Sequence, residues 1–410
     1  MPPVRSATIR VGHVVALYLA QTETFIHTQL VGLAASEAVV FTLRVENLEQ
    51  FPVDVPVVRY KLTPSAGWPI RLARKLGREA GLYRRLVNAP EYSLTSLTRR
   101  ERVGILHAHF APNGYLAIPA ARALRVPLVT SFYGYDASTL PHEPGWRRSL
   151  ALLFRAGSRF LAEGPAMAAR LAALGCPREK IAVVPIAIDL GRYRFQRRSR
   201  VPADRPVRLL FVGRLVEKKG AKYAIMAARE VMAAGIRASL DIVGEGPLRD
   251  DLAALVGANG LERHVRFLGT RTHAEVIELL GSSDVLLAPS VTGTDGDSEG
   301  GAPTILLEAQ ASGVPVVSTT HADIPAVTVP GRSALLGQEG NGPEFAALVV
   351  RVCSQTERWA EMGEEGAAFV RSRHGLEGVR ARLREVYLSV GRPGARRSTP
   401  RSSGASSIAQ

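Results

Sequence analysis

Two glutamates, Glu299 and Glu308, flank a Gly-Gly-Ala-Pro turn that leads into a helix-forming segment. A glycine-rich turn before a helix presents unpaired backbone N–H groups at the positive end of the helix dipole, and phosphate groups bind there readily. Carboxylates repel phosphate, but they accept strong hydrogen bonds from sugar hydroxyls. The pattern therefore predicts a site for a ligand that carries both phosphate and sugar.

Two cations come earlier in the same half of the chain. Arg214 and Lys219 follow the apolar segment VRLLFVG at 207–213, which has the pattern of a buried strand. Arginine offers a planar pair of donors to phosphate oxygens, and lysine offers a compact positive charge. Two cations on a loop are most often solvated, but their position after a strand, in the same half as the glutamates, favours a phosphate clamp.

The elements that must position these residues follow an alternating pattern. Short apolar segments alternate with helical patterns, which is typical of α/β domains with parallel sheets. The first series of predicted strands is Val11–Leu19, Val39–Leu43, Val53–Tyr60, Ile105–His109, Pro127–Phe132, Arg159–Ala162 and Ile181–Pro185, with helices such as Glu23–Ala35, Pro112–Leu124 and Gly164–Leu174 between them. A second series begins at Val207. Ligands of such sheets bind beyond the carboxyl ends of the strands.

Two series of similar size predict two Rossmann-like domains. The predicted organisation is a first domain at 1–191, a charged and Pro-bearing linker at 192–206, a second domain at 207–375, a long final helix at 376–390 and a disordered tail, rich in Gly, Ser and Arg, at 391–410. A chain of 410 residues suits two domains rather than one core.

Composition indicates a globular protein of a reducing compartment. Hydrophobic residues make up 46% and charged residues 22% of the chain, and no uncharged apolar run of about 18 residues predicts a transmembrane helix. The only cysteines, Cys176 and Cys353, are far apart, which fits the cytoplasm and offers no metal site. The segment after Arg10, VGHVVALYLA, has features of a signal peptide, but we interpret it as the first buried strand.

The net charge of +15 predicts attraction to polyanions, namely nucleic acid, anionic lipid or phosphorylated substrates. No recognised nucleic-acid-binding motif accompanies it, so we expect no nucleic-acid partner. Part of the charge lies in the segment RLARKLGREAGLYRRL at 71–86, which has the pattern of a basic amphipathic helix. Such a helix lies on a membrane surface or packs on its own domain with one face solvated, and both alternatives stay open.

The glutamate turn resembles the donor-binding motif of the retaining glycosyltransferases of family four, which have the GT-B fold. The usual motif, Glu-Gly-x-Pro-x-x-x-x-Glu, has seven residues between the acids, whereas Glu299 and Glu308 have eight between them because the turn carries one extra residue. The resemblance implies an α/β GT-B architecture, with two Rossmann-like domains, an interdomain cleft and a last helix that crosses back to the first domain.

The resemblance also implies roles for residues around the donor. Arg214 and Lys219, in a Gly-Arg…Lys-Gly pattern, would hold the diphosphate of a nucleotide sugar, with a UDP-sugar favoured. Glu299 would hold the transferred sugar and Glu308 the ribose. The remaining expected donor contacts are the backbone amides of Gly301, Ala302 and Thr304, the turn at Leu268 for the nucleotide base, and Thr22, which would cap the helix after the first strand.

On the acceptor side the chain reads Tyr133-Gly134-Tyr135-Asp136, where the exopolysaccharide branch of the family commonly has His-Gly-x-Asp. Neutral histidine takes a proton near pH 7, but a phenol is a poor base. Tyr133 is therefore expected to position the acceptor or the transferred sugar, and Asp136 to orient or partly deprotonate the acceptor hydroxyl. His109, at the end of another predicted strand, is a further catalytic candidate, although a packed histidine is the commoner case.

These expectations combine into a cytoplasmic, retaining transferase of a hexose-type sugar that needs no metal or other cofactor. Exopolysaccharide or glycolipid assembly is the expected setting, with a lipid-linked or anionic acceptor and peripheral contact with the inner membrane face. The alternatives are glycosylation of a secondary metabolite, an epimerase or hydrolase of sugar nucleotides, and a binding protein without activity. A nicotinamide-dependent oxidoreductase is disfavoured, because no Gly-x-Gly-x-x-Gly follows the first predicted strand.

Overall fold

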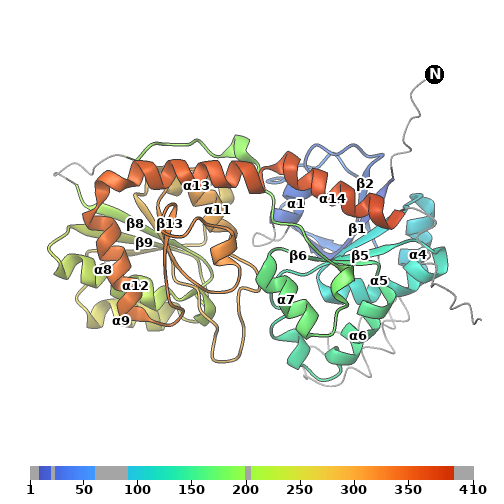
Figure 1. Cartoon of the computed structure of the whole chain (residues 1–410), viewed down its shortest axis with the longest axis horizontal. Coiled ribbons are helices and arrows are strands. Elements are labelled where there is room, and N and C mark those ends of the chain that lie inside the picture. Colours follow the sequence, from blue (N-terminus) through green and yellow to red (C-terminus); the bar gives the residue numbers. More distant parts are fainter. Residues whose placement is uncertain (1–8, 20–23, 61–90, 199–204, 392–410) are drawn as a thin grey trace, which may run out of the picture.

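The computed structural model describes residues 9–19, 24–60, 91–198 and 205–391, which form two α/β halves side by side (Figure 1). Thr22, the basic segment 71–86 and the tail after residue 391 lie outside the described residues. Each half contains a parallel β-sheet with helices on its faces. Two parallel sheets of this kind are the architecture that the alternating sequence pattern predicted.

The first sheet has seven strands in the order β3-β2-β1-β4-β5-β6-β7, and all of its strand pairs are parallel. Its strands are β1 Val11–Tyr18, β2 Ala38–Val45, β3 Val57–Arg59, β4 Ile105–His109, β5 Leu128–Ser131, β6 Arg159–Ala162 and β7 Ile181–Val183. The helices around it are α1 Thr24–Leu30, α4 Glu91–Arg100, α5 Ala111–Leu124, α6 Trp146–Ala156 and α7 Pro165–Ala173. Every residue of β4 and β5 is buried, as expected for strands covered on both faces.

The second sheet has six parallel strands in the order β10-β9-β8-β11-β12-β13. Its strands are β8 Val207–Val212, β9 Ala238–Val243, β10 Val265–Gly269, β11 Val285–Ala288, β12 Val316–Thr319 and β13 Ala334–Gly337. Its helices are α8 Ala221–Ala233, α9 Arg249–Ala258, α10 His273–Ser282, α11 Thr304–Ala311 and α12 Gly342–Ser354. The described part of the predicted linker lies between β7 and β8.

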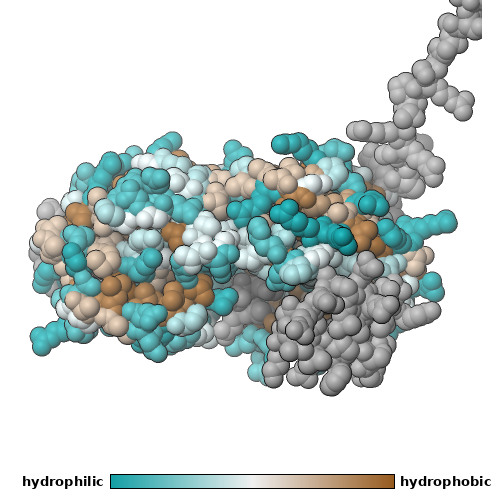
Figure 2. All heavy atoms as spheres, turned by 90° about the horizontal axis from the view of Figure 1, so that it is seen from below, coloured by the Kyte–Doolittle hydropathy of each residue, from teal (hydrophilic) through white to brown (hydrophobic). Residues whose placement is uncertain are grey.

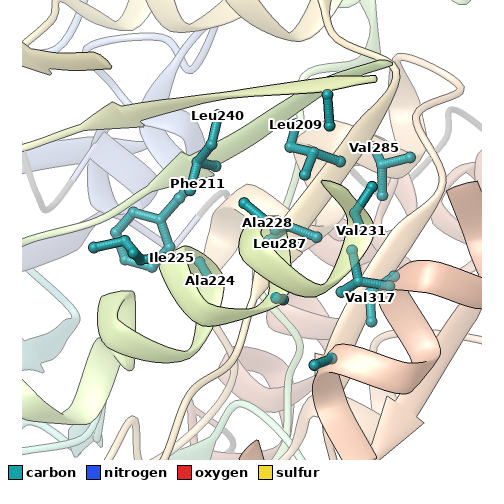
Figure 3. Close-up of a cluster of buried hydrophobic side chains, with 14 of the residues drawn as sticks. Leu209, Phe211, Ala224, Ile225, Ala228, Val231, Leu240, Val285, Leu287 and Val317 are labelled. Carbon is teal, nitrogen blue, oxygen red and sulfur yellow. The ribbon is translucent and has the colours of Figure 1, made fainter. Parts of the chain in front are cut away.

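The largest part of the second core lies between this sheet and α8. Figure 3 shows Phe211 and Leu240 of the strands against Ile225 and Val231 of the helix, and all four side chains are almost completely buried. Burial of aliphatic and aromatic side chains at these positions stabilises the domain, by roughly 25 cal/mol for each Å² of apolar surface removed from water.

The strand orders fix where a ligand site can form. In both sheets the order reverses next to the first strand, between β1 and β4 and between β8 and β11. Crevices at the carboxyl ends of the strands beside such a reversal are the usual ligand sites of open α/β sheets. The loops after β4, β5, β8 and β11 carry most of the candidate residues, so the topology places them at these edges.

The last two helices, α13 Trp359–His374 and α14 Leu376–Gly391, run along one side of the molecule from the second half to the first (Figure 1). Val379 and Leu383 of α14 are buried against Val11 and Ile105 of the first sheet. The last helix therefore crosses back to the first domain, as the resemblance implied.

Some predicted elements are shorter in the structure. The predicted strand Val53–Tyr60 is reduced to β3, because Pro56 lacks the N–H that a continued strand would donate. The predicted helix Glu23–Ala35 ends at Leu30, shortly before Gly32 takes a left-handed conformation with a φ of 71°.

Among the described residues, no helix has both the length and the apolar character needed to cross a bilayer. Figure 2 shows hydrophilic and apolar residues interspersed over the described surface of one face.

The packing of α14 predicts the effect of a truncated side chain. Leu383→Ala is expected to lower the free energy of unfolding by about 2–5 kcal/mol, because it leaves a cavity against the first sheet. Leu388→Ala on the same helix is the matched control, since Leu388 is 47% exposed. Urea unfolding followed by circular dichroism measures both. Equal, small effects of the two variants would contradict this packing.

Candidate functional site

The glutamate turn joins β11 to α11 and ends in backbone groups that have no acceptor. Gly300 has a φ of 79°, a left-handed conformation that favours glycine. Within the described residues, no hydrogen-bond acceptor is bound to the backbone N–H of Gly301, Ala302 or Thr304. The first N–H groups of a helix have no partner inside the helix. The turn therefore offers several donors to an anion, as the sequence predicted.

Glu299 and Lys219 form an ion pair at the mouth of this turn. Lys219 Nζ lies 2.8 Å from Glu299 Oε2, and Ser290 Oγ donates to Glu299 Oε1 at 2.8 Å. Burial alone would raise the pKa of Glu299, but the Lys219 ammonium and the Ser290 hydroxyl outweigh it and hold the pKa below its usual value. The structure thus brings together a predicted phosphate ligand and a predicted sugar ligand.

The other cations lie on the same loop after β8. Lys218 Nζ bonds to Asp297 Oδ1 at 3.0 Å and to the carbonyl of Ser298 at 3.3 Å, so it fixes the start of the glutamate turn. Arg214 is exposed and forms no side-chain hydrogen bond or ion pair with another described residue. Its guanidinium is therefore available to an anionic ligand.

His321, which sequence analysis did not select, orients Glu299. His321 follows β12 and is 2% exposed. Its Nε2 accepts the backbone N–H of Glu299 at 3.1 Å, so its proton is on Nδ1, which donates to Glu339 Oε2 at 2.8 Å. Only a neutral imidazole of this tautomer can make both bonds. The sequence offered no motif that links His321 to a turn more than twenty residues earlier.

Glu308 lies on α11 beside a second pocket. Its Oε2 is 3.6 Å from His273 Nε2, and the same ring nitrogen is 3.0 Å from the hydroxyl of Tyr193. The pocket is partly open to solvent and is lined by residues of both domains, namely Phe25, Thr28, Ile186, Ala187, Ile188, Asp189, Arg192, Tyr193, His273, Thr304 and Glu308. Leu268, the predicted base contact, packs half-buried against the neighbouring apolar cluster and does not line this pocket.

Tyr133 and His109 form a buried hydrogen-bonded chain in the first domain. The Tyr133 hydroxyl is 2.7 Å from His109 Nδ1, and His109 Nε2 is 3.0 Å from His13 Nδ1. Burial lowers the pKa of His109 well below its usual value, helped by the neighbouring His13, and burial raises the pKa of Tyr133. Both groups are therefore neutral, which favours a positioning role over proton transfer.

Three histidines at this place also meet the geometric requirement for a metal site. Ring nitrogens of His13, His107 and His109 lie within 4.8 Å of one another, and all three residues are buried. The His107 nitrogens already have hydroxyl partners, Tyr387 at 2.7 Å and Ser131 at 2.8 Å. Hydrogen bonds between the rings and hydroxyls thus account for this cluster without a metal.

Asp136 anchors backbone, which argues against the predicted contact with an acceptor hydroxyl. Its Oδ1 accepts the N–H groups of Tyr133 at 3.0 Å and Gly134 at 3.1 Å, and its Oδ2 accepts the N–H of Ala111 at 3.0 Å. The side chain is fully buried, and burial raises its pKa to about 6. Asp136 joins the start of α5 to the loop after β5 and thereby holds Tyr133 in place.

The two domains meet at this loop. A Cβ atom on Gly134 would lie 2.5 Å from the carbonyl oxygen of Glu299, and one on Gly300 would overlap the Gly134 backbone. Nearby, the Asp323 carboxylate of the second domain accepts the first N–H groups of α7, from Ala166 at 2.7 Å and Met167 at 3.0 Å. The loop of Tyr133 and the glutamate turn, which carry predicted acceptor and donor residues, therefore lie in direct contact.

Comparisons with known proteins define the class. Residues 206–355 match a family model described as glycosyl transferases group 1, and residues 22–192 match one described as Glycosyltransferase Family 4. The two matches together span more than half of the chain. The chain belongs to this family of glycosyltransferases, as the glutamate turn indicated.

Two relatives of this chain are glycosyltransferases of polysaccharide biosynthesis. The chain is 38% identical over 242 residues to the colanic acid biosynthesis glycosyltransferase WcaL of Salmonella typhimurium, covering 58% of this chain and 59% of the relative. It is 33% identical over 250 residues to the amylovoran biosynthesis glycosyltransferase AmsK of Erwinia amylovora, covering 60% and 61%. The chain thus spans about three fifths of the length of these relatives.

Solved structures share the fold. Anabaena Alr3699/HepE in complex with UDP-glucose superposes with a TM-score of 0.73 at 17% identity, covering 93% of this chain and 100% of that one. The lipopolysaccharide outer core galactosyltransferase WaaB superposes with a TM-score of 0.69 at 15% identity, covering 93% and 99%. At such low identities the likeness establishes the GT-B fold and not the substrate.

The environment of Asp136 predicts a pH dependence of stability. Its folded pKa of about 6 exceeds the unfolded value of 3.8, so its contribution is fully present below pH 3.8 and is lost as pH rises through 6. Between pH 5 and pH 7 the protein is expected to lose about 1 kcal/mol from this group.

Urea unfolding of Asp136→Asn at the two pH values measures this loss, with Asp54→Asn at an exposed position as the control. The stability gap between the wild type and Asp136→Asn should narrow from pH 5 to pH 7. A gap that stays constant would contradict the assigned environment.

Proposed function

We propose that the protein is a retaining glycosyltransferase that moves a hexose-type sugar from a nucleotide diphosphate sugar to an acceptor hydroxyl. The observation that carries this proposal is that the Lys219–Glu299 pair, the free amides of the glutamate turn and the loop of Tyr133 come together where the two domains meet. A site with phosphate donors and sugar-binding carboxylates side by side suits a nucleotide sugar.

The donor is proposed to span the second domain. The diphosphate would bind Arg214, Lys219 and the amides of the turn, and the ribose would bind Glu308 at the pocket between the domains. HepE, which shares the fold, has been solved in complex with UDP and with UDP-glucose, and this supports a UDP-sugar as the donor. The sugar would then lie beside Glu299, whose ionised carboxylate accepts hydrogen bonds from hydroxyls.

The reaction is proposed to occur on one face of the sugar. The bond between the anomeric carbon and the phosphate oxygen breaks, the acceptor oxygen bonds to the same face, and the departing phosphate takes the acceptor proton. Negative charge grows on the phosphate, and preorganised cations and N–H groups stabilise it in a crevice with little water. The buried, neutral Tyr133 and His109 position the reactants and take no proton.

The biological setting is proposed from the relatives. WcaL and AmsK carry names from colanic acid and amylovoran biosynthesis, and they favour exopolysaccharide assembly for this chain. Alpha-D-kanosaminyltransferase of Streptomyces kanamyceticus is less similar, at 27% identity over 188 residues, and glycosylation of a secondary metabolite is the second candidate. The net charge of +15 supports a lipid-linked acceptor and peripheral contact with the cytoplasmic face of a membrane.

The ion pair predicts the effect of removing its cation. Lys219→Ala should weaken binding of UDP by about 10- to 100-fold, because a charge-assisted bond to phosphate is lost. Isothermal titration calorimetry measures the dissociation constant. Lys222→Ala, on the exposed side of the next helix, is the control and should bind UDP as the wild type does. Unchanged binding to Lys219→Ala would contradict the assignment.

Fixed cations also predict catalysis that needs no metal. Lysine and arginine side chains on the loop after β8 supply the positive charge that a divalent ion gives to other diphosphate sites. Transfer from UDP-sugars should therefore proceed at the same rate in excess EDTA as in buffer. Loss of turnover in EDTA, with recovery on addition of Mg²⁺ or Mn²⁺, would show that a metal takes part.

A further inference from the structure

Glu163 lies at the same edge of the first sheet as Tyr133, yet the mechanism above does not use it. It follows β6 directly, and the next residues begin α7. A Cβ atom on Gly301 would overlap the Glu163 carboxylate. The side chain therefore reaches across the crevice to the turn that is proposed to hold the donor phosphate.

Glu163 also lines a cavity in the first domain whose walls are partly polar and mostly apolar. The cavity has about 270 Å³ of open space, and its lining includes Gln29, Ser131, Tyr133 and Leu383. The Gln29 side chain is 8% exposed, and its amide oxygen is buried without a hydrogen-bond partner among the described residues. A buried, unpaired oxygen costs free energy unless a ligand or water donates to it. Glu163 and Gln29 thus place polar atoms at one cavity, beside Tyr133.

The carboxyl of Glu163 is uncommitted, in contrast to that of Asp136. No hydrogen bond or ion pair joins Glu163 to another described residue. Both carboxylate oxygens of Asp136 accept hydrogen bonds, from three backbone N–H groups in total. Of the two first-domain carboxyls near the crevice, Glu163 is the one that can contact a substrate.

The charges around Glu163 are mainly negative. Asp136 faces it from the loop after β5, Glu299 from the glutamate turn and Asp323 from the region after β12. Burial, with these three carboxylates, raises the pKa of Glu163 well above its usual value. The neighbouring phenol of Tyr133 is neutral.

The nearby cations are already engaged. Lys219 is paired with Glu299, and Arg170 donates to the Ser298 hydroxyl at 2.7 Å. Binding of a carboxylate or phosphate of the acceptor in this cavity is consequently unfavourable. Uncharged hydroxyls, in contrast, form hydrogen bonds with both carboxyl and amide groups.

We propose that Glu163 and Gln29 bind the acceptor through the hydroxyls of an uncharged sugar, with Glu163 beside the Gly301 turn where the new glycosidic bond forms. This inference rests on the proposed glycosyltransferase function. It assigns to Glu163 the acceptor contact that the sequence assigned to Asp136. It also places any anionic part of the acceptor outside the cavity, so the accepting end is a neutral hexose and not a uronic acid.

The test measures acceptor binding to UDP-loaded protein by saturation-transfer NMR. The probes are octyl glucoside, octyl galactoside and octyl mannoside, with octyl glucuronide as the charged counterpart. At least one neutral hexoside should bind, and the glucuronide should bind at least about tenfold more weakly, the equivalent of one hydrogen bond. Preference for the glucuronide, or failure of every neutral hexoside while UDP binds, overturns the inference.

Two variants at position 163 test whether Glu163 itself makes the contact with the acceptor. Glu163→Ala should weaken binding of the neutral hexoside by about tenfold or more, and the isosteric Glu163→Gln by only a few-fold, because its amide keeps the hydrogen bonds. Glu143→Gln at an exposed position is the control. UDP affinity, measured by calorimetry, should stay within about twofold in all three variants.

The outcomes separate this inference from the proposed function. Unchanged hexoside binding by Glu163→Ala overturns the inference, as does a parallel loss of UDP and hexoside binding, which would place Glu163 in the donor site. Absence of UDP binding by the wild type would instead overturn the proposed function itself.

Discussion

The site depends on a close approach of two backbones that only glycine permits. Gly134 of the first domain and Gly300 of the second lie so close that a side chain on either would meet the opposite backbone. Their contact places the loop of Tyr133 against the glutamate turn. The extra residue of the turn, relative to the usual family motif, is thereby accommodated at the point where the domains meet.

Around this contact, the buried carboxylates differ in the groups that hold them. Asp136 and Asp323 accept backbone N–H groups and fix the loop after β5 and the start of α7. Glu299 is held by Lys219, and its backbone by His321. A diphosphate brought to the turn would compete with Glu299 for the Lys219 ammonium. Release of Glu299 toward sugar hydroxyls would then accompany donor binding, and in the proposed function this one ion pair would link phosphate recognition to sugar recognition.

Much of the fold was predictable from sequence because its signals are local. Apolar segments such as Val207–Val212 and Ile105–His109 read as buried strands, and the glutamate turn identified the family without any structure. The placement of Glu299 and Lys219 at one site followed from their positions after strands of one sheet. The direct ion pair between them was not predicted.

The roles of single polar residues were less predictable, because they depend on contacts between distant segments. Asp136 matched a family motif, but its oxygens are taken by N–H groups of the loop and of α5, which no spacing reveals. His321 and Glu163 carried no motif, and their importance follows only from which residues the two sheets bring opposite them. A motif predicts which residue type occupies a position. Whether that side chain can contact a substrate depends on whether other residues already occupy its hydrogen-bonding atoms.

The central claim is that the glutamate turn and the loop after β8 hold the diphosphate of the donor. A crystal structure of the complex with UDP tests it most directly. We expect phosphate oxygens within hydrogen-bond distance of the Gly301 and Ala302 amides and of Lys219, with the Lys219–Glu299 ion pair opened. UDP bound elsewhere, or bound with that ion pair intact and the amides free, would contradict it.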